Sequence, residues 1–379
     1  MILMREVDGK WIVISGIFLI VLSISSFFIF TGGTKIVQIG GFFDGNLDEA
    51  GVGVATDVLV KNNIAYLLDA SDGLEILDIS DPSNIQELGQ FQKDDVSFYP
   101  RKVFVSEDIA YFAVRYYGLK LINILDPSNP IEIGLYGNNC SILDVFISEE
   151  VAYIAAGENG VEILNISNPS NIMQISNYTD NYNNTWSLDF DEQNNLLYVA
   201  DRIDGIEILD VSNLSSPVEL GQLALESAVE IDVVGNFAYI SLYDNGLSIV
   251  DVSDPSDPVE ISRFEDRIIK DVFVNGTSCY LVTDHGLFLL DVSDPVNPVI
   301  SNAYTYQNSA GGVFINADLI YYANGYAGLE ILQIKPTNLN YYLAGFLIVP
   351  GLIMVYFGVK LLGKLNEETK YMENIVRNY

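Results

Sequence analysis

The chain has 379 residues, of which 49% are hydrophobic, and it carries a formal net charge of −33 at pH 7. This length allows one large domain with flanking segments, and the strong negative charge argues against a nucleic-acid-binding protein because phosphates would be repelled. The two cysteines, Cys140 and Cys279, lie far apart without metal-ligand spacing, so we expect two unpaired thiols rather than a disulfide.

The first predicted element is a membrane-spanning helix over residues 11–30, preceded by a short tail over residues 1–10. The helical segment is uncharged, mostly apolar and twenty residues long, which is enough to cross a bilayer. A cleaved signal peptide is the alternative, but its apolar region would be unusually long, and Ser25–Phe28 offers no small-x-small cleavage pattern. We therefore expect an uncleaved anchor.

Residues 31–337 form the main predicted domain, in which one unit recurs. Each copy opens with a glycine, continues with branched aliphatic residues that suit a strand covered on both sides, and ends in a turn that is usually Asp-Pro. A period in the low forties with several strands per unit is typical of a β-propeller. Seven copies predict an all-β fold, a seven-bladed β-propeller of four-stranded blades. The opening glycines are 40 to 45 residues apart, at Gly73, Gly118, Gly160, Gly205, Gly246, Gly286 and Gly328.

One tyrosine recurs on the second strand of every predicted blade. A ring of aromatic side chains could stack against a ligand, but recurrence in every blade favours packing between neighbouring blades. The seven residues are Tyr66, Tyr111, Tyr153, Tyr198, Tyr239, Tyr280 and Tyr321.

The start of the domain resembles the last strand of a blade. Residues 34–43 are similar to the stretches that follow the turns, such as residues 85–91 and 130–136, whereas the final repeat ends at Ile334 without such a strand. We therefore predict that the N-terminal strand closes the last blade, which removes an exposed sheet edge and joins the two ends of the domain.

A second apolar run predicts a membrane-spanning helix over residues 341–362, followed by a tail over residues 363–379. The Pro-Gly pair at 350–351 is tolerated in a membrane helix as a kink. Lysines follow this run, and Arg5 and Lys10 precede the first one. By the positive-inside rule, both termini are cytoplasmic and the propeller is extracytoplasmic, which predicts a plasma-membrane protein.

The repeat carries a family resemblance. The pattern Gly-Leu-x-Ile-x-Asp-Val-Ser-Asp-Pro is clearest at residues 246–255 and 286–295, and it resembles the LVIVD repeat, a β-propeller module of archaeal and bacterial surface proteins. The resemblance covers about residues 34–335. It departs at Asn213-Leu214, where the first proline is missing, and at Ile85 and Ile172, which replace the second. The resemblance implies an extracytoplasmic repeat domain and brings no catalytic residues.

Aspartates recur on the innermost strands, beside the predicted central channel. They could bind a cation such as Ca²⁺, which takes six to eight oxygen ligands, or each could hydrogen-bond to the backbone of the adjacent blade. We favour the structural role and expect no other cofactor. The five are Asp57, Asp144, Asp189, Asp232 and Asp271, while the other two blades have Lys102 and Gly312 at this position.

The search for catalytic groups is mostly negative. His285 is the only histidine and lies in a predicted loop, so no Ser-His-Asp triad or histidine-rich metal site can be assembled. The sequence also lacks a phosphate-binding glycine motif. We predict a binding or interaction scaffold at the cell surface rather than an enzyme. The alternative is a carbohydrate-active or cofactor-dependent enzyme that uses the channel carboxylates.

The loops between second and third strands, with the linkers between blades, are the predicted working face. They vary from copy to copy on a repeating scaffold, as recognition loops do, and they are rich in acid and tyrosine. Such a surface suits a cationic partner or stacking against sugars, so we expect an unknown surface protein or glycan to bind a monomeric propeller. The opposite face, which carries the Asp-Pro turns, should lie against the membrane. The predicted binding residues are Tyr116, Tyr117, Trp186, Tyr243 and Asp244.

Two glycosylation sequons lie in one polar loop. Asn177 and Asn183 each begin an Asn-x-Ser/Thr tripeptide within or beside residues 177–184. If the host glycosylates its surface proteins, these two asparagines are the predicted sites.

Overall fold

The computed structural model describes residues 34–43, 54–70, 72–91, 100–137, 140–179, 184–264, 268–305 and 311–336, together with the backbone of residues 2–7 and 10–15. The chain divides into two compact units. One contains residues 33–337, and the other contains residues 1–32 and 338–379.

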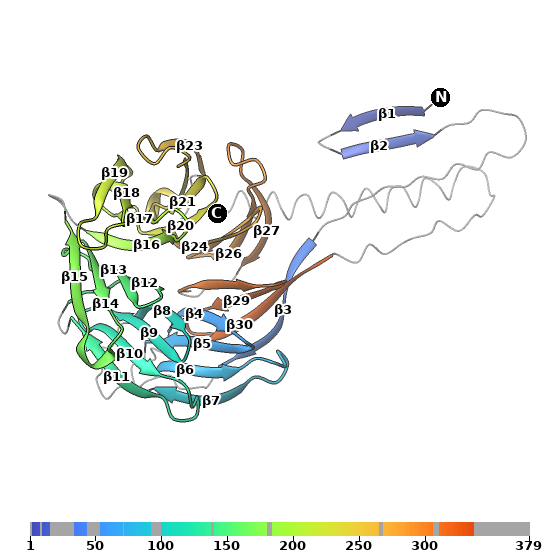
Figure 1. Ribbon diagram of the computed structural model, residues 1–379. Helices are drawn as coiled ribbons and strands as arrows, with labels where there is room; N and C mark the ends of the chain where they lie inside the picture. Colours follow the sequence, from blue (N-terminus) through green and yellow to red (C-terminus); the bar gives the residue numbers. More distant parts are fainter. Residues whose placement is uncertain are drawn as a thin grey trace, which may run out of the picture. The chain divides into compact units, whose positions relative to one another are not determined.

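The larger unit consists of seven four-stranded antiparallel sheets, which we number as blades 1 to 7 in chain order (Figure 1). Blade 1 contains β4 (Ala55–Lys61), β5 (Ile64–Asp69), β6 (Gly73–Asp78) and β7 (Gln86–Phe91). Blade 2 contains β8 (Pro100–Ser106), β9 (Ile109–Val114), β10 (Gly118–Asn123) and β11 (Ile131–Tyr136). Blade 3 contains β12 (Asp144–Ser148), β13 (Val151–Ala155), β14 (Val161–Asn165) and β15 (Met173–Tyr178), with the short 3-10 helix η1 (Pro169–Asn171) before its last strand.

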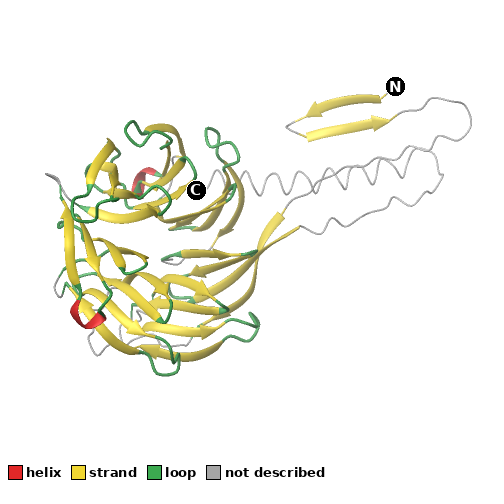
Figure 2. Ribbon diagram, in the orientation of Figure 1, coloured by secondary structure: helices red, strands yellow, loops and turns green. Residues whose placement is uncertain are grey.

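Blade 4 contains β16 (Thr185–Asp191), β17 (Leu196–Asp201), β18 (Gly205–Asp210) and β19 (Val218–Leu223). Blade 5 contains β20 (Glu230–Val234), β21 (Phe237–Ser241), β22 (Leu247–Asp251) and β23 (Val259–Phe264), with the 3-10 helix η2 (Tyr243–Asn245) in one loop. Blade 6 contains β24 (Ile269–Asn275), β25 (Ser278–Thr283), β26 (Gly286–Asp291) and β27 (Val299–Thr305). Strands and loops make up nearly all of the described chain (Figure 2).

Blade 7 joins the two ends of the domain. It contains β28 (Val313–Asn316), β29 (Leu319–Ala323) and β30 (Leu329–Pro336), and its fourth strand is β3 (Thr34–Phe42). The pairing of β3 with β30 runs from Thr34 opposite Pro336 to Phe42 opposite Leu329. The predicted seven-bladed propeller and its closure by the N-terminal strand are both confirmed.

The core lies between neighbouring blades. The third strand of each blade is buried on both sides, because an adjacent blade covers each face; Leu74, Ile76 and Leu77 of β6 are all fully buried. One cluster packs Tyr66 and Ile76 of blade 1 with other side chains of blades 1 and 2. The recurring tyrosines are 3–6% exposed, as the packing role predicts.

The outer strands are held to the next blade by a repeated contact that we call the outer clasp. In blade 1, a Cβ on Gly89 would lie 2.2 Å from the carbonyl oxygen of Pro127 in the turn of blade 2, so only glycine fits. In blade 3, Ser176 occupies the equivalent position and its hydroxyl donates to the Leu214 carbonyl at 2.5 Å. Leu214 stands where most repeats have proline, so the clasp survives that departure from the pattern. Equivalent contacts join Gly40 to Pro82, Gly134 to Pro169, Gly221 to Pro255 and Ser262 to Pro295.

The predicted membrane helices are not seen among the described residues. No helix in those parts of the chain is long and apolar enough to span a bilayer. Residues 16–30 and 341–362 lie outside the described residues. The first positions of the predicted helix differ from expectation, because Lys10–Ser15 forms strand β2 and pairs with β1 (Ile2–Val7). The run Ile12-Val-Ile14 is β-branched, which favours an extended backbone.

Candidate binding face and central channel

The antiparallel order of the strands gives the propeller two faces. We call the face with the linkers between blades and the loops between second and third strands the loop face. The opposite face, with the hairpins between first and second strands and the Asp-Pro turns, is the turn face. The loops between second and third strands are residues 70–72, 115–117, 156–160, 202–204, 242–246, 284–285 and 324–328.

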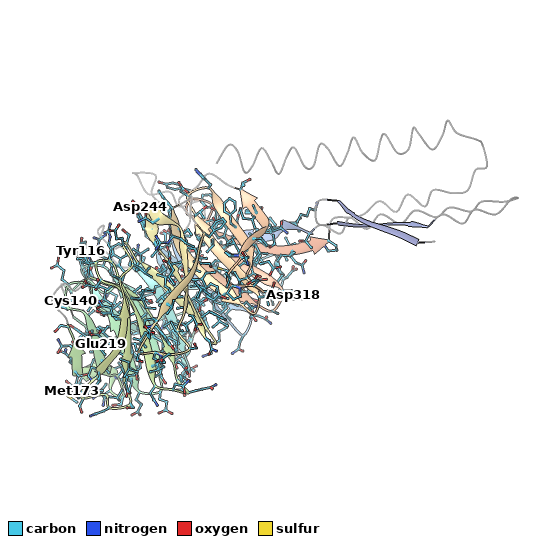
Figure 3. All side chains as sticks on the ribbon, turned by 90° about the horizontal axis from the view of Figure 1, so that it is seen from above. Tyr116, Cys140, Met173, Glu219, Asp244 and Asp318 are labelled. Carbon is cyan, nitrogen blue, oxygen red and sulfur yellow. The ribbon has the colours of Figure 1, made fainter. Side chains whose placement is uncertain are left out.

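Exposed aromatic side chains gather on the loop face. Four of the described aromatic residues are among the most exposed large hydrophobic residues: Phe43, Tyr116, Tyr243 and Tyr326, at 54%, 53%, 39% and 42%. All four follow a strand that ends on the loop face. Exposed aliphatic residues such as Leu125, which is 68% exposed, lie mainly on the turn face or the outer strands. Figure 3 shows Tyr116 and Asp244 along one side of the domain, away from Met173.

Two of these tyrosines have an unusual backbone. Tyr116 has a φ of 71° and Tyr243 a φ of 49°. Residues other than glycine rarely adopt a positive φ. Such conformations cost about 1 kcal/mol or more and tend to persist at functional sites. Both exposed rings therefore belong to residues with a locally strained backbone.

The other three predicted binding residues lie differently. Asp244 is exposed beside Tyr243, as expected. Tyr117 is half-buried and packs against the core between blades 1 and 2, because the loop turns its side chain inward. Variation between copies of a repeat does not reveal which loop side chains face the core. Trp186 is partly buried on β16, the innermost strand of blade 4, and its indole N–H donates to Asn184 Oδ1 at 2.9 Å.

Two arginines from different blades approach the Trp186 ring. The guanidinium carbon of Arg101, on β8 of blade 2, lies 5.4 Å from the ring centroid. That of Arg202, in a loop of blade 4, lies at 5.2 Å. Both distances fit cation–π contacts. We call Arg101, Trp186 and Arg202 the tryptophan site; the three side chains are set where the innermost strands begin, on the loop face.

The arginines of the loop face form no ion pair with a carboxylate of the described residues, although Arg101 interacts electrostatically with Glu230. Arg101, Arg202 and Arg115, which lies 5.0 Å from the Tyr116 ring, form no ion pair there. The Nε atom of Arg101 is buried and has no hydrogen-bond partner in the same described parts. The chain has 51 acidic and 18 basic residues, so unpaired arginines are unexpected in it. Sequence reasoning missed this grouping, although the scarcity of basic residues was a usable signal.

The five channel aspartates hold adjacent blades together. Each carboxylate accepts a hydrogen bond from a backbone N–H on the innermost strand of the next blade, as the structural interpretation predicts. Asp144 also accepts one from the Ser187 hydroxyl at 2.8 Å. The bonds run from Val103 N to Asp57 at 2.8 Å, Leu188 N to Asp144 at 3.0 Å, Val233 N to Asp189 at 2.7 Å, Val274 N to Asp232, and Val313 N to Asp271 at 2.8 Å.

Blades 2 and 7 have Lys102 and Gly312 in place of the aspartate, and both residues contact aspartates of other blades. Lys102 Nζ lies 2.9 Å from Asp271 Oδ1 and 3.4 Å from Glu230 Oε2. A Cβ on Gly312 would lie 2.5 Å from Asp57 Oδ1, so glycine leaves room for this carboxylate. Glu230 was not singled out in the sequence, because only one blade has an acid at its position. The described residues contain no group of three acidic, histidine or cysteine side chains arranged to hold a metal ion.

Burial dominates the protonation of the channel. It raises the pKa of Asp57 to about 7, and that of Glu230 and Asp232 to about 8. Lys102 opposes these shifts. Burial works against the charge of Lys102 itself, but the carboxylates of Asp271, Glu230 and Asp57 outweigh it and raise the lysine pKa well above its ordinary value. At neutral pH, Glu230 and Asp232 are therefore mostly protonated and Lys102 is charged.

The raised pKa values predict that stability falls as the pH rises. The unfolded chain releases these protons near the ordinary aspartate value of 3.8, whereas the folded chain keeps them until about 7 or 8. The folded state thus binds more protons between these limits, so each raised group destabilises it progressively from about pH 4 to about pH 8. Urea unfolding at pH 5 and pH 8 should show a drop of about 1 kcal/mol or more.

Asp232→Asn is the matched variant for this measurement. Its amide oxygen can still accept from Val274 N–H, but it has no proton to lose. The drop in the free energy of unfolding between pH 5 and pH 8 should be smaller in this variant than in the native protein. Equal drops would show that the general repulsion of a highly acidic chain, and not Asp232, governs the pH dependence.

Only one of the two predicted glycosylation sites lies among the described residues. Asn177 lies on β15 and is exposed, with its side chain accessible for modification. Asn183 lies outside the described residues.

The protein is thus a seven-bladed β-propeller in which buried aspartates form hydrogen bonds between adjacent blades. The LVIVD repeat profile matches six segments, at residues 52–93, 99–138, 141–180, 193–224, 227–266 and 266–306. The chain therefore belongs to the LVIVD-repeat proteins. The seventh blade, which is assembled from both ends of the domain, falls outside the matched segments. No curated protein matches the sequence significantly.

Solved structures share the fold at low identity. The β-propeller domain of Cps50 (Swd1) from Myceliophteria thermophila is 11% identical, with a TM-score of 0.62, over 79% of this chain and 100% of that one. An inactive virginiamycin B lyase from Staphylococcus aureus, solved with quinupristin, is 12% identical, with a TM-score of 0.62, over 79% and 99%. PorZ, a surface component of the type-IX secretion system of Porphyromonas gingivalis, is 13% identical, with a TM-score of 0.54, over 79% and 39%.

Proposed function

We propose that the propeller is a binding module whose loop face holds a partner at the cell surface. The observation that carries this proposal is that the exposed aromatic rings lie on that face, together with three arginines that form no ion pair with the described residues. Aromatic residues and arginine are the types most enriched at the centres of binding interfaces. The channel carboxylates, in contrast, are engaged with backbone N–H groups, which favours a scaffold over an enzyme that uses them.

We also propose that the module is anchored in the plasma membrane by residues 11–30 and 341–362, with both termini cytoplasmic. Their length and apolar character support this, as does the charge of the flanking residues. The pairing of Thr34 with Pro336 brings both ends of the propeller to the turn face. The loop face is thus the face opposite the two points of attachment.

Alanine substitutions on the loop face should abolish binding. Tyr116→Ala and Tyr243→Ala each remove an exposed ring that contributes little to folding, so partner capture should fall by about tenfold or more while the melting temperature changes little. The measurement is capture of envelope components from the native host by the tagged full-length protein. Leu125→Ala and Val296→Ala on the turn face are the controls. Greater loss of capture in the controls would mean that the turn face is the binding face.

Protease protection should report the topology. Tags at residue 1 and at residue 379 are expected to be shielded in intact cells, because both tails are proposed to be cytoplasmic, while the propeller is digested. Loss of the N-terminal tag from the mature protein would show instead that the first apolar segment is a cleaved signal peptide.

A further inference from the structure

We infer that the tryptophan site binds the carboxylate of an acidic sugar, a hexuronate unit of a glycan. This inference rests on the proposed binding function and names its ligand class. The three residues come from two blades that are not neighbours, so the site forms only when these blades are folded together.

The arginines supply the recognition of the carboxylate. Each guanidinium offers five N–H donors in a planar fork that matches a carboxylate. Arg101 and Arg202 both approach the Trp186 ring and neither is paired with a carboxylate of the described residues. The buried Nε of Arg101 lacks a partner there, and leaving a donor in this state costs about 1–3 kcal/mol. A ligand carboxylate would satisfy it.

Two acids bear on this site. Asp201 precedes Arg202, and its carboxylate accepts from the backbone N–H groups of Asn184, Ile203 and Asp204. Glu230 sets a condition on binding. It interacts electrostatically with Arg101, Lys102, Asp271 and Asp144, and burial raises its pKa to about 8. At neutral pH it is mostly protonated, and Lys102 lies 3.4 Å from it. It therefore leaves the positive charge of Arg101 largely available to a ligand.

The charge of the whole protein restricts the kind of anion. A net charge of −33 repels polyanions over long distances, so nucleic acids and highly sulfated chains are disfavoured. An isolated carboxylate is recognised by short-range contacts, which salt and the long-range field affect less.

The aromatic surroundings favour a sugar over a peptide. The exposed Tyr116, Tyr243 and Tyr326 offer flat rings against which the C–H faces of sugars can pack, whereas the Trp186 ring is already in contact with two guanidinium groups. The free strand edges belong to the outer strands, β3 among them, and not to the loop face, so a peptide could not add itself there as a strand. A peptide held by its C-terminal carboxylate is the competing outcome of the test.

The test is a titration of the full-length protein with D-glucuronate and with trigalacturonate. Binding is monitored through the change in tryptophan fluorescence. Trp186 is one of two tryptophans in the chain and the only one in the propeller, so its emission reports the site directly. Both uronates should change this emission, and glucose should not. Arg202→Gln, which changes an exposed side chain, should weaken binding by about tenfold, the effect of losing one charge-assisted contact.

Arg263→Gln is the matched control, because this arginine lies on β23 and pairs with Glu260 at 2.7 Å. It should bind the uronates like the native protein. Equal binding of glucose and glucuronate, unchanged binding in Arg202→Gln, or no binding of either uronate would each overturn the inference. Binding of N-acetyl-dialanine but not of the uronates would replace the sugar with a peptide terminus. If Arg202→Gln still captures its envelope partner, the binding module stands and only the hexuronate assignment fails.

Discussion

Replacing residues 34–42 with a glycine–serine segment of equal length should lower the free energy of unfolding by about 5 kcal/mol or more. The replacement removes β3, in which Ile36 is buried and Ile39 and Phe42 pack against the core. Burying one such side chain contributes about 1.5–3 kcal/mol, and the pairing with β30 is lost as well. Blade 7 would then keep three strands and expose the edge of β30, a template for aggregation.

Chemical unfolding and light scattering of the purified protein would measure both effects. Gln38→Ala is the control, because this side chain is exposed on the same strand and should change stability little. A native-like unfolding curve for the strand replacement would contradict the closure of the ring through β3.

Lys102→Met should destabilise the propeller by about 3 kcal/mol at pH 8. The substitution keeps most of the side-chain volume but removes the ammonium that lies near Asp271 and Glu230. Both carboxylates are more than nine-tenths buried, and breaking such a pair leaves an uncompensated charge in a region of low dielectric constant. The loss should shrink at pH 5, where Glu230 is protonated because burial raises its pKa to about 8.

The double variant Lys102→Met with Asp271→Asn separates charge from packing. The asparagine oxygen can still accept from Val313 N–H, so much of the lost stability should return. Lys335→Met, at an exposed position on β30, should have little effect. If the double variant were no more stable than Lys102→Met alone, the defect would come from packing and not from an unpaired charge.

The repeat made most of the fold predictable from sequence. Three features recur from blade to blade: the spacing of the glycines, a buried tyrosine in every blade and an inward aspartate in five blades. A single irregular copy therefore does not obscure the pattern. The closing strand could be found because β3 resembles the other outer strands. The aspartate bonds to the next blade could also be anticipated, because a buried carboxylate requires a donor and the adjacent backbone is the nearest one.

The tryptophan site could not be predicted in the same way. Arg101, Trp186 and Arg202 are not repeated at the equivalent positions of the other blades. Their contacts also join blade 2 to blade 4, and no local sequence pattern predicts such a contact. The acid-rich loops suggested a cationic partner, whereas two of the four arginines whose side chains are described, Arg101 and Arg202, lie where the loops meet the channel. Glu230 and the inward turn of Tyr117 were missed for the same reason, since repeat comparison identifies what blades share and not how they differ.

The ion pair between Lys102 and Asp271 has a consequence for the size of the ring. It joins blade 2 to blade 6, which are not neighbours, so its length of 2.9 Å depends on the width of the central channel. The aspartate bonds to the next blade and the outer clasps, in contrast, join only adjacent blades and do not span the channel. An extra blade would widen the channel and pull the ammonium away from its carboxylates, while one blade fewer would crowd them. The contact across the channel therefore matches the channel width that seven blades provide, and it adds to the packing between neighbouring blades in favouring that number.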